Sequence, residues 1–220
     1  MNILLSWSSG KDSAWALHVL KQTHPGCVGG LLTTVNDAYD RVAMHGVRTA
    51  VVQAQARAAG LPLRIVLIPD QCSNEAYEKR MQHAVTGAVA DGFTHVAFGD
   101  LFLRDIRQYR EERLAGTGLQ PLFPLWDLPT TTLAADMIDA GIRARVACID
   151  NRRMPETFVG RDFDRRLLEE LPSTVDPCGE NGEFHTCVYA GPMFSAPVDL
   201  LPGEIVRRDP FVWSDLLLAR

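Results

Sequence analysis

The sequence has few cysteines, and no two of them form a CxxC pair. Disulfide frameworks and common zinc sites need paired or closely spaced cysteines. The C-x6-H-x-C spacing around His185 matches no common zinc pattern and has no fourth ligand nearby. We therefore expect free thiols in a reducing compartment. The five cysteines are scattered over 220 residues, at Cys27, Cys72, Cys148, Cys178 and Cys187.

Long apolar runs are also absent. No stretch approaches the roughly 20 apolar residues that a membrane-spanning helix needs. The first residues, MNILLSW, are too few for the apolar part of a signal peptide and lack its basic start. These absences predict a cytoplasmic protein without a membrane partner.

Positive charge is not in excess, because 22 Lys and Arg stand against 27 Asp and Glu, for a net charge of -5. The chain therefore lacks the broad basic surface that binds duplex nucleic acid, and DNA is not an expected partner. One local group of arginines recurs every three residues. It is either a solvated helix face paired with Glu111 and Glu112 or an anion-binding surface. Its members are Arg104, Arg107, Arg110 and Arg113.

The glycines of two common nucleotide-binding loops are missing from residues 4–13, LLSWSSGKDS. A Walker A loop, GxxxxGK[ST], would need glycine at Leu5 and a hydroxyl residue at Asp12. A GxGxxG dinucleotide fingerprint would need more glycines than Gly10. Both types of site are excluded.

Apolar strand-like segments alternate with helix-like segments through the first 150 residues. Continuous apolar strands separated by helices indicate parallel pairing with both faces covered. The fold class is therefore α/β, with a doubly wound parallel sheet. The expected strands span 2–7, 28–34, 63–68 and 94–99, and the expected helices span 13–21, 47–59 and 74–90, with Gly60 ending the second helix.

The pattern changes beyond residue 105. A polar helix over 105–114 leads into an irregular Gly- and Pro-containing connection, GTGLQPLFPLWDLP. A capped helix over 131–140, a strand over 143–149 and a helix over 163–171 follow, and the tail from 172 onwards should form short strands. We place a boundary near 115, which gives a first domain over 1–115 and a smaller α+β region over 116–220.

The first loop has the residues of an anion site. Small hydroxyl side chains, one glycine and a lysine precede a helix, whose first N–H groups and dipole attract phosphate. If Ser9 requires a positive φ, this serine is strained, because glycine adopts that conformation more easily. In a doubly wound sheet, ligands bind where the strand order reverses. If the strand over 94–99 lies beside the first strand, Gly99 and Asp100 face the loop, where Asp100 either binds a ligand or caps its own loop.

The stretch DPCGENGEFHTC, residues 176–187, is the second unusual feature. Two carboxylates, an amide and a histidine lie close together in it, namely Glu180, Glu183, Asn181 and His185. From spacing alone, GENG is equally compatible with a tight turn that opens a strand. His45 and Arg48, in the segment MHGVR, either contact a ligand or cap the helix that follows.

The motifs together resemble a known family. The loop Ser8, Ser9, Gly10, Lys11, Asp12 and Ser13 resembles the PP-loop (SGGxDS) of the adenine nucleotide alpha-hydrolase superfamily, the N-type ATP pyrophosphatases, with Ser9 in place of the first glycine. Taken with MHGVR, GDLFLRDIRQYREER and DPCGENGEFHT, it resembles the diphthine-ammonia ligase family, over nearly the whole chain and in the same order. The fold implied is of the HUP type.

The resemblance implies ATP-dependent amidation, in which a carboxylate is adenylated, pyrophosphate leaves and ammonia displaces AMP. Lys11 and the PP-loop would then stabilise pyrophosphate, and Asp12 or Asp100 would bind Mg²⁺. Glu180 and Glu183 would lie near the carboxylate or ammonia, with His185 assisting. The acceptor would be diphthine on elongation factor 2 if the source makes diphthamide, and otherwise a small carboxylate. Free ammonium is the simpler nitrogen source, and a homodimer is compatible with the sequence.

Two other functions compete with this one. A PP-loop sulfurtransferase that modifies tRNA would carry a cysteine pair or a basic RNA-binding appendage, and neither is evident. A nucleotide sensor without turnover would not need GENGEFHT. For the ligase, we predict that Lys11→Ala weakens ATP binding, whereas Glu183→Ala spares it and abolishes amide formation.

Overall fold

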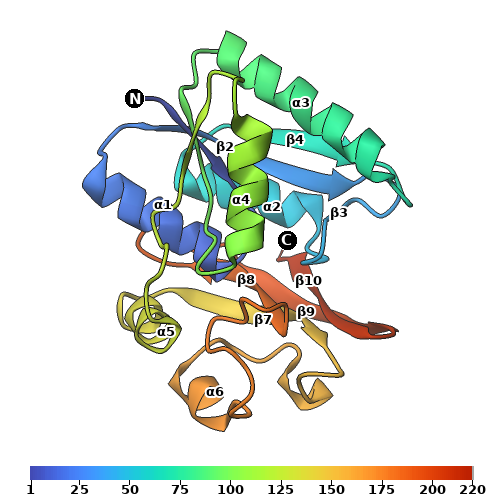
Figure 1. Cartoon of the computed structure of the whole chain (residues 1–220). Coiled ribbons are helices and arrows are strands. Elements are labelled where there is room, and N and C mark those ends of the chain that lie inside the picture. Colours follow the sequence, from blue (N-terminus) through green and yellow to red (C-terminus); the bar gives the residue numbers. More distant parts are fainter. Residues whose placement is uncertain (220) are drawn as a thin grey trace.

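The structure is a computed structural model that describes residues 1–219. Two sheets form separate layers, and helices α1 (Lys11–Thr23) and α2 (Thr49–Ala59) pack against both of them (Figure 1). A single large apolar core joins these helices to both layers, and a smaller core lies on the opposite face of the first sheet. Within the described residues, no helix is both long enough and apolar enough to cross a membrane.

The first sheet confirms the expected doubly wound α/β class. Its strands β1 (Ile3–Ser6), β2 (Val28–Asn36), β4 (Leu63–Ile68), β5 (His95–Ala97) and β6 (Gln120–Leu122) pair in parallel. Strand β1 lies between β2 and β5, so the strand order reverses beside the PP-loop, as predicted. Side chains alternate across β1, with Leu5 facing the α1 core and Leu4 facing the core under α3 (Asn74–Ala90).

The helix limits follow from local signals. Gly60 adopts a left-handed φ of 70° and ends α2, and the Ser73 side chain accepts a hydrogen bond from Ala76 N at the start of α3. Helix α4 (Arg104–Leu114) covers the same face of the first sheet as α3.

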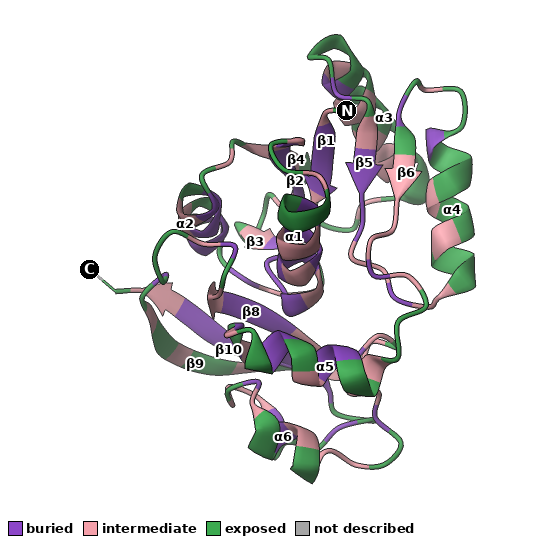
Figure 2. Ribbon diagram, turned by 90° about the vertical axis from the view of Figure 1, so that its left-hand side faces the viewer, coloured by how far each residue is buried: buried purple, intermediate pink, exposed green. Residues whose placement is uncertain are grey.

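The second sheet is antiparallel, with the order β8 (Phe184–Ala190), β7 (Arg143–Asp150), β10 (Phe211–Leu218) and β9 (Leu200–Arg208). Helix α5 (Thr130–Asp139), the short helix η1 (Glu156–Phe158) and α6 (Arg165–Glu170) belong to this layer (Figure 1). Buried residues concentrate on β7, β8 and β10, whereas β9 is largely exposed. Figure 2 shows this contrast between β8 and β9.

Five details differ from the predictions. The tail from 172 onwards was expected to form short strands, but its strands β8, β9 and β10 have 7, 9 and 8 residues. Strand β6 forms inside the connection that we expected to be irregular, and β3 (Arg41–Val42) was not foreseen. Helix α5 has no side-chain cap, because Pro129 precedes it. The helix expected over 163–171 is shorter, since Phe163 packs in the core and Asp164 caps α6. Strand β6 lies after residue 115, and the domain division there stays a prediction.

Candidate functional site

The PP-loop has a strained backbone. Ser9 has a φ of 73°. This value lies in the left-handed region, which is energetically unfavourable for residues other than glycine. Its side chain is buried, and its Oγ has no hydrogen-bond partner among residues 1–219. Gly10 begins α1 without a side-chain cap, so this helix start relies on other segments for its partners.

Those partners come mainly from the second sheet. Lys11 N donates to Thr186 Oγ1 at 3.0 Å, and Val188 N donates to Ser9 O at 2.9 Å. Gln55, from α2, links the PP-loop to β8, because its Nε2 donates to Ser9 O at 3.1 Å and to Val188 O at 2.6 Å. The PP-loop is therefore held in place by β8 and by a buried glutamine that the sequence analysis missed.

The Lys11 side chain points toward the loop 176–186. It is 2% exposed, its Nζ lies 2.9 Å from Asp12 Oδ2, and it also donates to Cys178 O. The rings of Phe163 and Phe184 lie 5.5 Å and 5.3 Å from Nζ. Burial opposes the positive charge, but Asp12 outweighs this and raises the pKa of Lys11. A role in pyrophosphate binding stays a prediction, and it would require Lys11 to exchange or share these partners.

Asp176 organises the loop 176–186, and the sequence analysis did not single it out. Its Oδ2 accepts hydrogen bonds from Cys178 N and Glu180 N, both at 3.0 Å, and its Oδ1 accepts one from Thr130 Oγ1 at 2.6 Å. Gly179 turns the chain with a φ of 69°, and a Cβ at this position would lie 2.7 Å from Phe184 O. This arrangement fixes where Glu180 points.

Glu180 reaches the carboxyl end of the first sheet. Its Oε1 accepts a hydrogen bond from Leu101 N at 2.8 Å, just beyond β5. Burial raises the pKa of Glu180 to about 7, and Asp12, Lys11 and Asp100 are near enough to influence it. A carboxyl group with this pKa can accept or donate a proton near neutral pH.

Glu183 is bound within its own loop. It is 3% exposed, and its Oε1 accepts hydrogen bonds from Asp176 N at 3.1 Å and Asn181 Nδ2 at 3.0 Å. Its Oε2 is buried and has no hydrogen-bond partner in the part of the chain that the structure describes. GENG therefore forms a turn before strand β8, which is one of the two alternatives given in the sequence analysis. Glu180 and Glu183 have different surroundings within this turn.

His185 packs against His45, with their ring centroids 4.6 Å apart. Burial lowers the pKa of His45 to about 3 and that of His185 to about 4, so both rings are neutral at pH 7. His45 Nδ1 donates to Thr186 O at 3.1 Å, which leaves its Nε2 as an acceptor. His45 does not cap α2; instead it contacts the PP-loop, since a Cβ on Gly10 would lie 2.7 Å from its Cε1.

Gly99 and Asp100 follow β5, where the predicted strand order places them. A Cβ on Gly99 would lie 2.9 Å from Asp12 C, so only glycine allows β5 to end so close to the start of α1. Asp100 forms a two-point ion pair with Arg110, whose second contact is 3.1 Å long. Asp100 is thus bound to an arginine, and it does not cap its own loop.

The carboxylates expected to bind magnesium both have cationic partners. Within residues 1–219, no group of three or more His, Cys, Asp or Glu side chains is arranged to hold a metal ion. The side chains of Asp12 and Asp100 remain 26% and 15% exposed. Mg²⁺ is commonly bound by one or two carboxylates, with phosphate oxygens and water as the other ligands. The available donors fit an ion that arrives with a nucleotide, and this assignment stays a prediction.

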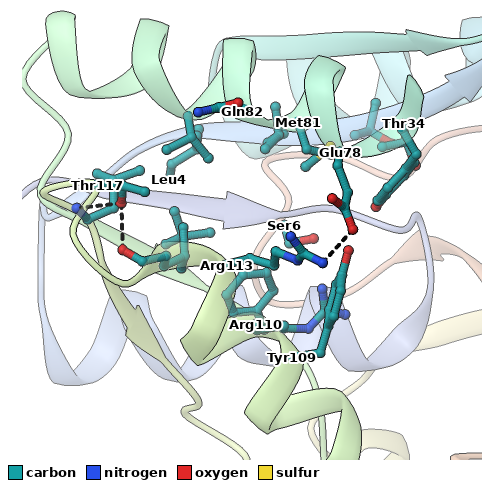
Figure 3. A pocket seen from close by; sticks show the side chains of 18 of the residues that line it. Leu4, Ser6, Thr34, Glu78, Met81, Gln82, Tyr109, Arg110, Arg113 and Thr117 are labelled. Atoms are coloured by element: carbon teal, nitrogen blue, oxygen red, sulfur yellow. Dashed lines mark hydrogen bonds and ion pairs between the residues drawn. The ribbon is translucent and has the colours of Figure 1, made fainter. Parts of the chain in front are cut away.

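A cavity of about 470 Å³ adjoins the PP-loop. It lies over the first sheet between α3 and α4, with Ser6 and Thr34 at the strand ends and Arg110, Tyr109 and Glu78 around it (Figure 3). Its inner part is apolar, and Ser8 of the PP-loop also lines it. We call it the nucleotide cavity, because it is large enough to enclose a nucleoside.

The arginines of α4 are mostly paired. Arg107 contacts Glu111 at 2.8 Å, Arg110 contacts Asp100, and Arg113 contacts Glu78. Glu112 accepts a hydrogen bond from Gln108 Nε2 at 2.8 Å and, among the described residues, forms no ion pair with an arginine. The arginine group is therefore largely a paired helix face, with Arg110 and Arg113 at the edge of the nucleotide cavity.

Three of the five cysteine thiols are unsuited to nucleophilic chemistry. All five are free, and burial raises the pKa of Cys148 and Cys187 to about 12 and that of Cys178 further. A buried thiol with a raised pKa carries little of the reactive thiolate at neutral pH.

Two family models match the chain. The model of the diphthamide synthase N-terminal domain matches residues 1–120, and that of the diphthamide synthase C-terminal domain matches residues 129–213. No curated protein matches the chain. Both matches include segments that meet at the site, namely the PP-loop and the loop 176–186.

Proposed function

Because this chain belongs to the diphthine-ammonia ligase family, we propose that it is an ATP-dependent amide ligase that forms AMP and pyrophosphate. One observation carries the proposal beyond the family match. The PP-loop and the carboxyl group of Glu180, whose pKa is raised to about 7, come from different layers and meet at one site. An anion-binding helix start beside a proton-accepting carboxylate suits adenylation followed by amidation.

ATP would bind across the PP-loop, with its base and ribose in the nucleotide cavity. The first N–H groups of α1 and its dipole would attract the phosphates. In the first step, a carboxylate oxygen of the acceptor attacks the α-phosphorus, and pyrophosphate leaves. When bound, Mg²⁺ would neutralise phosphate charge, with Asp12 and Asp100 as its protein ligands.

Ammonia would then attack the acyl carbon of the adenylate. The products are the amide, AMP and one proton, and Glu180 would accept that proton. Glu183 would hold Asp176 and Asn181, and so the loop that carries Glu180. The neutral imidazoles of His45 and His185 would offer hydrogen-bond acceptors beside the PP-loop. We propose diphthine on elongation factor 2 as the acceptor and free ammonium as the nitrogen source.

The test is a nucleotide assay with defined components. Purified protein is incubated with α-labelled ATP, Mg²⁺, ammonium and elongation factor 2 carrying diphthine, and AMP is resolved from ADP. We expect AMP and pyrophosphate only when the acceptor is present, and an ammonium-dependent loss of one negative charge on the acceptor. Glu169→Gln, at an exposed position of α6, is the matched control for Glu180→Gln.

Each other outcome contradicts a different part of the proposal. ADP as product would indicate a kinase-like reaction. ATP binding without turnover would indicate a sensor. AMP formation with a small carboxylate but not with elongation factor 2 would keep the chemistry and change the acceptor.

A further inference from the structure

A second cavity, of about 330 Å³, lies between the segment 36–46 and strands β9 and β10 of the second sheet. Val42 and Ala43 line both this cavity and the nucleotide cavity. The two cavities are therefore neighbours, separated by one stretch of backbone. A ligand in the second cavity would lie next to the bound nucleotide.

The segment 44–46 also connects the second cavity to the PP-loop. Met44 and Gly46 line the cavity, whereas His45, between them, contacts Gly10 and Thr186. Consecutive Cα atoms are about 3.8 Å apart, so the cavity wall lies within a few residue lengths of the reaction centre. This distance suits a subsite for the molecule that reacts with ATP.

The walls of the second cavity are aromatic. Tyr39 comes from the segment 36–46, and Phe211 and Trp213 come from one face of β10, with ring centroids 5.7 Å apart. Trp213 is fixed in place because its Nε1 donates to Met44 O at 3.3 Å. Aromatic walls give a bound side chain a large apolar contact area.

The charge of the cavity is positive. Asp215 accepts hydrogen bonds from Arg41 at 2.8 Å and from Arg48 at 2.6 Å, so its negative charge is already compensated. Arg208 lies over the ring of Tyr39 at 4.8 Å and forms no ion pair within residues 1–219. An arginine without a carboxylate partner beside an aromatic wall favours an anionic ligand.

The rim of the cavity extends beyond what a small molecule would cover. Tyr39 and Met44 are 46% and 61% exposed. Strand β9 is the last strand of its sheet, so one of its edges has no strand partner within the described residues, and it lies on the outside of the molecule (Figure 2). An exposed apolar rim and a free strand edge are features of surfaces that bind an extended protein segment.

We propose that the second cavity is the acceptor subsite, which takes a protein segment carrying an anionic side chain. The rings of Tyr39, Phe211 and Trp213 pack against the apolar part of the segment, and Arg208 pairs with its negative charge. This inference rests on the proposed function, because it assumes that the acceptor is a protein.

The test compares two neighbouring charge reversals, Arg208→Glu and Arg207→Glu. Both change the net charge equally, but alternate residues of a strand face opposite sides, and Arg207 pairs with Glu156 at 2.9 Å away from the cavity. Binding of elongation factor 2 carrying diphthine is measured by interferometry with a non-hydrolysable ATP analogue present. We expect Arg208→Glu to raise Kd at least about tenfold and Arg207→Glu to change it less than about twofold.

Two further measurements separate this inference from the proposed function. The Kd for the ATP analogue should be equal in all three proteins, and Arg208→Lys should keep most of the affinity for the acceptor. Equal effects of the two reversals, or no binding of the factor to the unaltered protein, would overturn the subsite. Binding that depends on Arg208 without any AMP formation would instead keep the subsite and overturn the ligase reaction.

Discussion

The PP-loop and the loop 176–186 meet at one site, but they are stabilised in different ways. The loop 176–186 supplies several of its own backbone acceptors, since Asp176 accepts two backbone N–H groups and Glu183 accepts a third. The PP-loop has internal hydrogen bonds, such as that from Gly10 N to Ser8 Oγ, but it is also held by other segments. It contains a left-handed serine with an unpartnered hydroxyl, and its backbone depends on Thr186, Val188 and Gln55.

This difference indicates that the two layers have different structural roles. The second layer supplies a preformed frame, and the PP-loop is shaped by docking onto that frame. Lys11 illustrates the arrangement, because its ammonium group binds Cys178 O of the opposite loop. Changes that loosen the backbone of the loop 176–186 should therefore affect nucleotide binding, even where the altered residue touches no part of the PP-loop.

The strongest test of the comparison is Glu180→Gln against Glu183→Gln. If Glu180 is the proton acceptor, its replacement should lower the rate of amide formation by about 10²- to 10⁴-fold with little change in ATP affinity. Since the pKa of Glu180 is about 7, activity should rise with pH around 7, and Glu180→Gln should lose this inflection. Pre-steady-state amide formation between pH 5.5 and 8.5 measures both effects.

Glu183→Gln should act through the fold. The sequence predicted that a change at Glu183 abolishes amide formation, but its buried, hydrogen-bonded position predicts instead a lower stability and a smaller loss of rate, with the pH inflection retained. If Glu183→Gln lost the pH inflection and Glu180→Gln kept it, Glu183 and not Glu180 would be the proton acceptor.

The next effect in size is that of Asp176→Ala. The substitution leaves Cys178 N, Glu180 N and Thr130 Oγ1 without their acceptor, and about 2–3 kcal/mol of stability should be lost. ATP affinity should fall as well, because the loosened loop no longer supports the PP-loop. Urea unfolding and ATP titration test this, with the exposed Asp162→Ala as control. Unchanged ATP affinity in a destabilised variant would show that the PP-loop holds its shape independently.

The ion pairs of Asp215 with Arg41 and Arg48 are a second contact between the layers, and they predict a pH-dependent stability. Burial alone would raise the pKa of Asp215, but hydrogen bonds from Arg48 and Arg41 outweigh it and lower the pKa to about 2. An aspartate has a pKa of about 3.9 when unfolded, so the stabilisation is present above that pH and is lost as pH falls through about 2.

Asp215→Asn should thus lower the free energy of unfolding at pH 7 by on the order of 2 kcal/mol, from the same shift in pKa. The difference from the unaltered protein should shrink between pH 4 and pH 2. Urea unfolding at several pH values measures it, with the exposed Asp199→Asn as control. A difference that stays constant with pH would mean that the ion pairs contribute no net stability.

The sequence was informative where a signal is local. The strand Leu63–Ile68 and the helix Asn74–Ala90 have the predicted limits, because apolar periodicity, Gly60 and Ser73 act within a few residues. The fold class and the position of the PP-loop after β1 followed from the same signals. Strands β3 and β6 were missed because two or three residues carry no periodicity.

The organisation of the site depends on contacts across the chain, which no local pattern encodes. Gln55 contacts Ser9 and Val188, and the Lys11 side chain contacts a carbonyl 167 residues away. A buried glutamine on a helix resembles any polar residue until the tertiary structure gives it partners. The motif 176–187 was recognised, but the sequence could not tell that Asp176 and Glu183 hold the loop while Glu180 reaches across the site.

The smallest predicted effect concerns the strain at Ser9. Ser9→Gly should stabilise the protein by about 1 kcal/mol, because relief of the left-handed conformation and loss of the unpartnered hydroxyl outweigh the greater flexibility of unfolded glycine. Ser9→Ala separates the two terms, since it removes the hydroxyl but keeps the strained Cβ. Thermal or urea unfolding of both variants measures the difference. If Ser9→Gly proved less stable than Ser9→Ala, the frame supplied by β8 would be strong enough to hold a side chain there without strain.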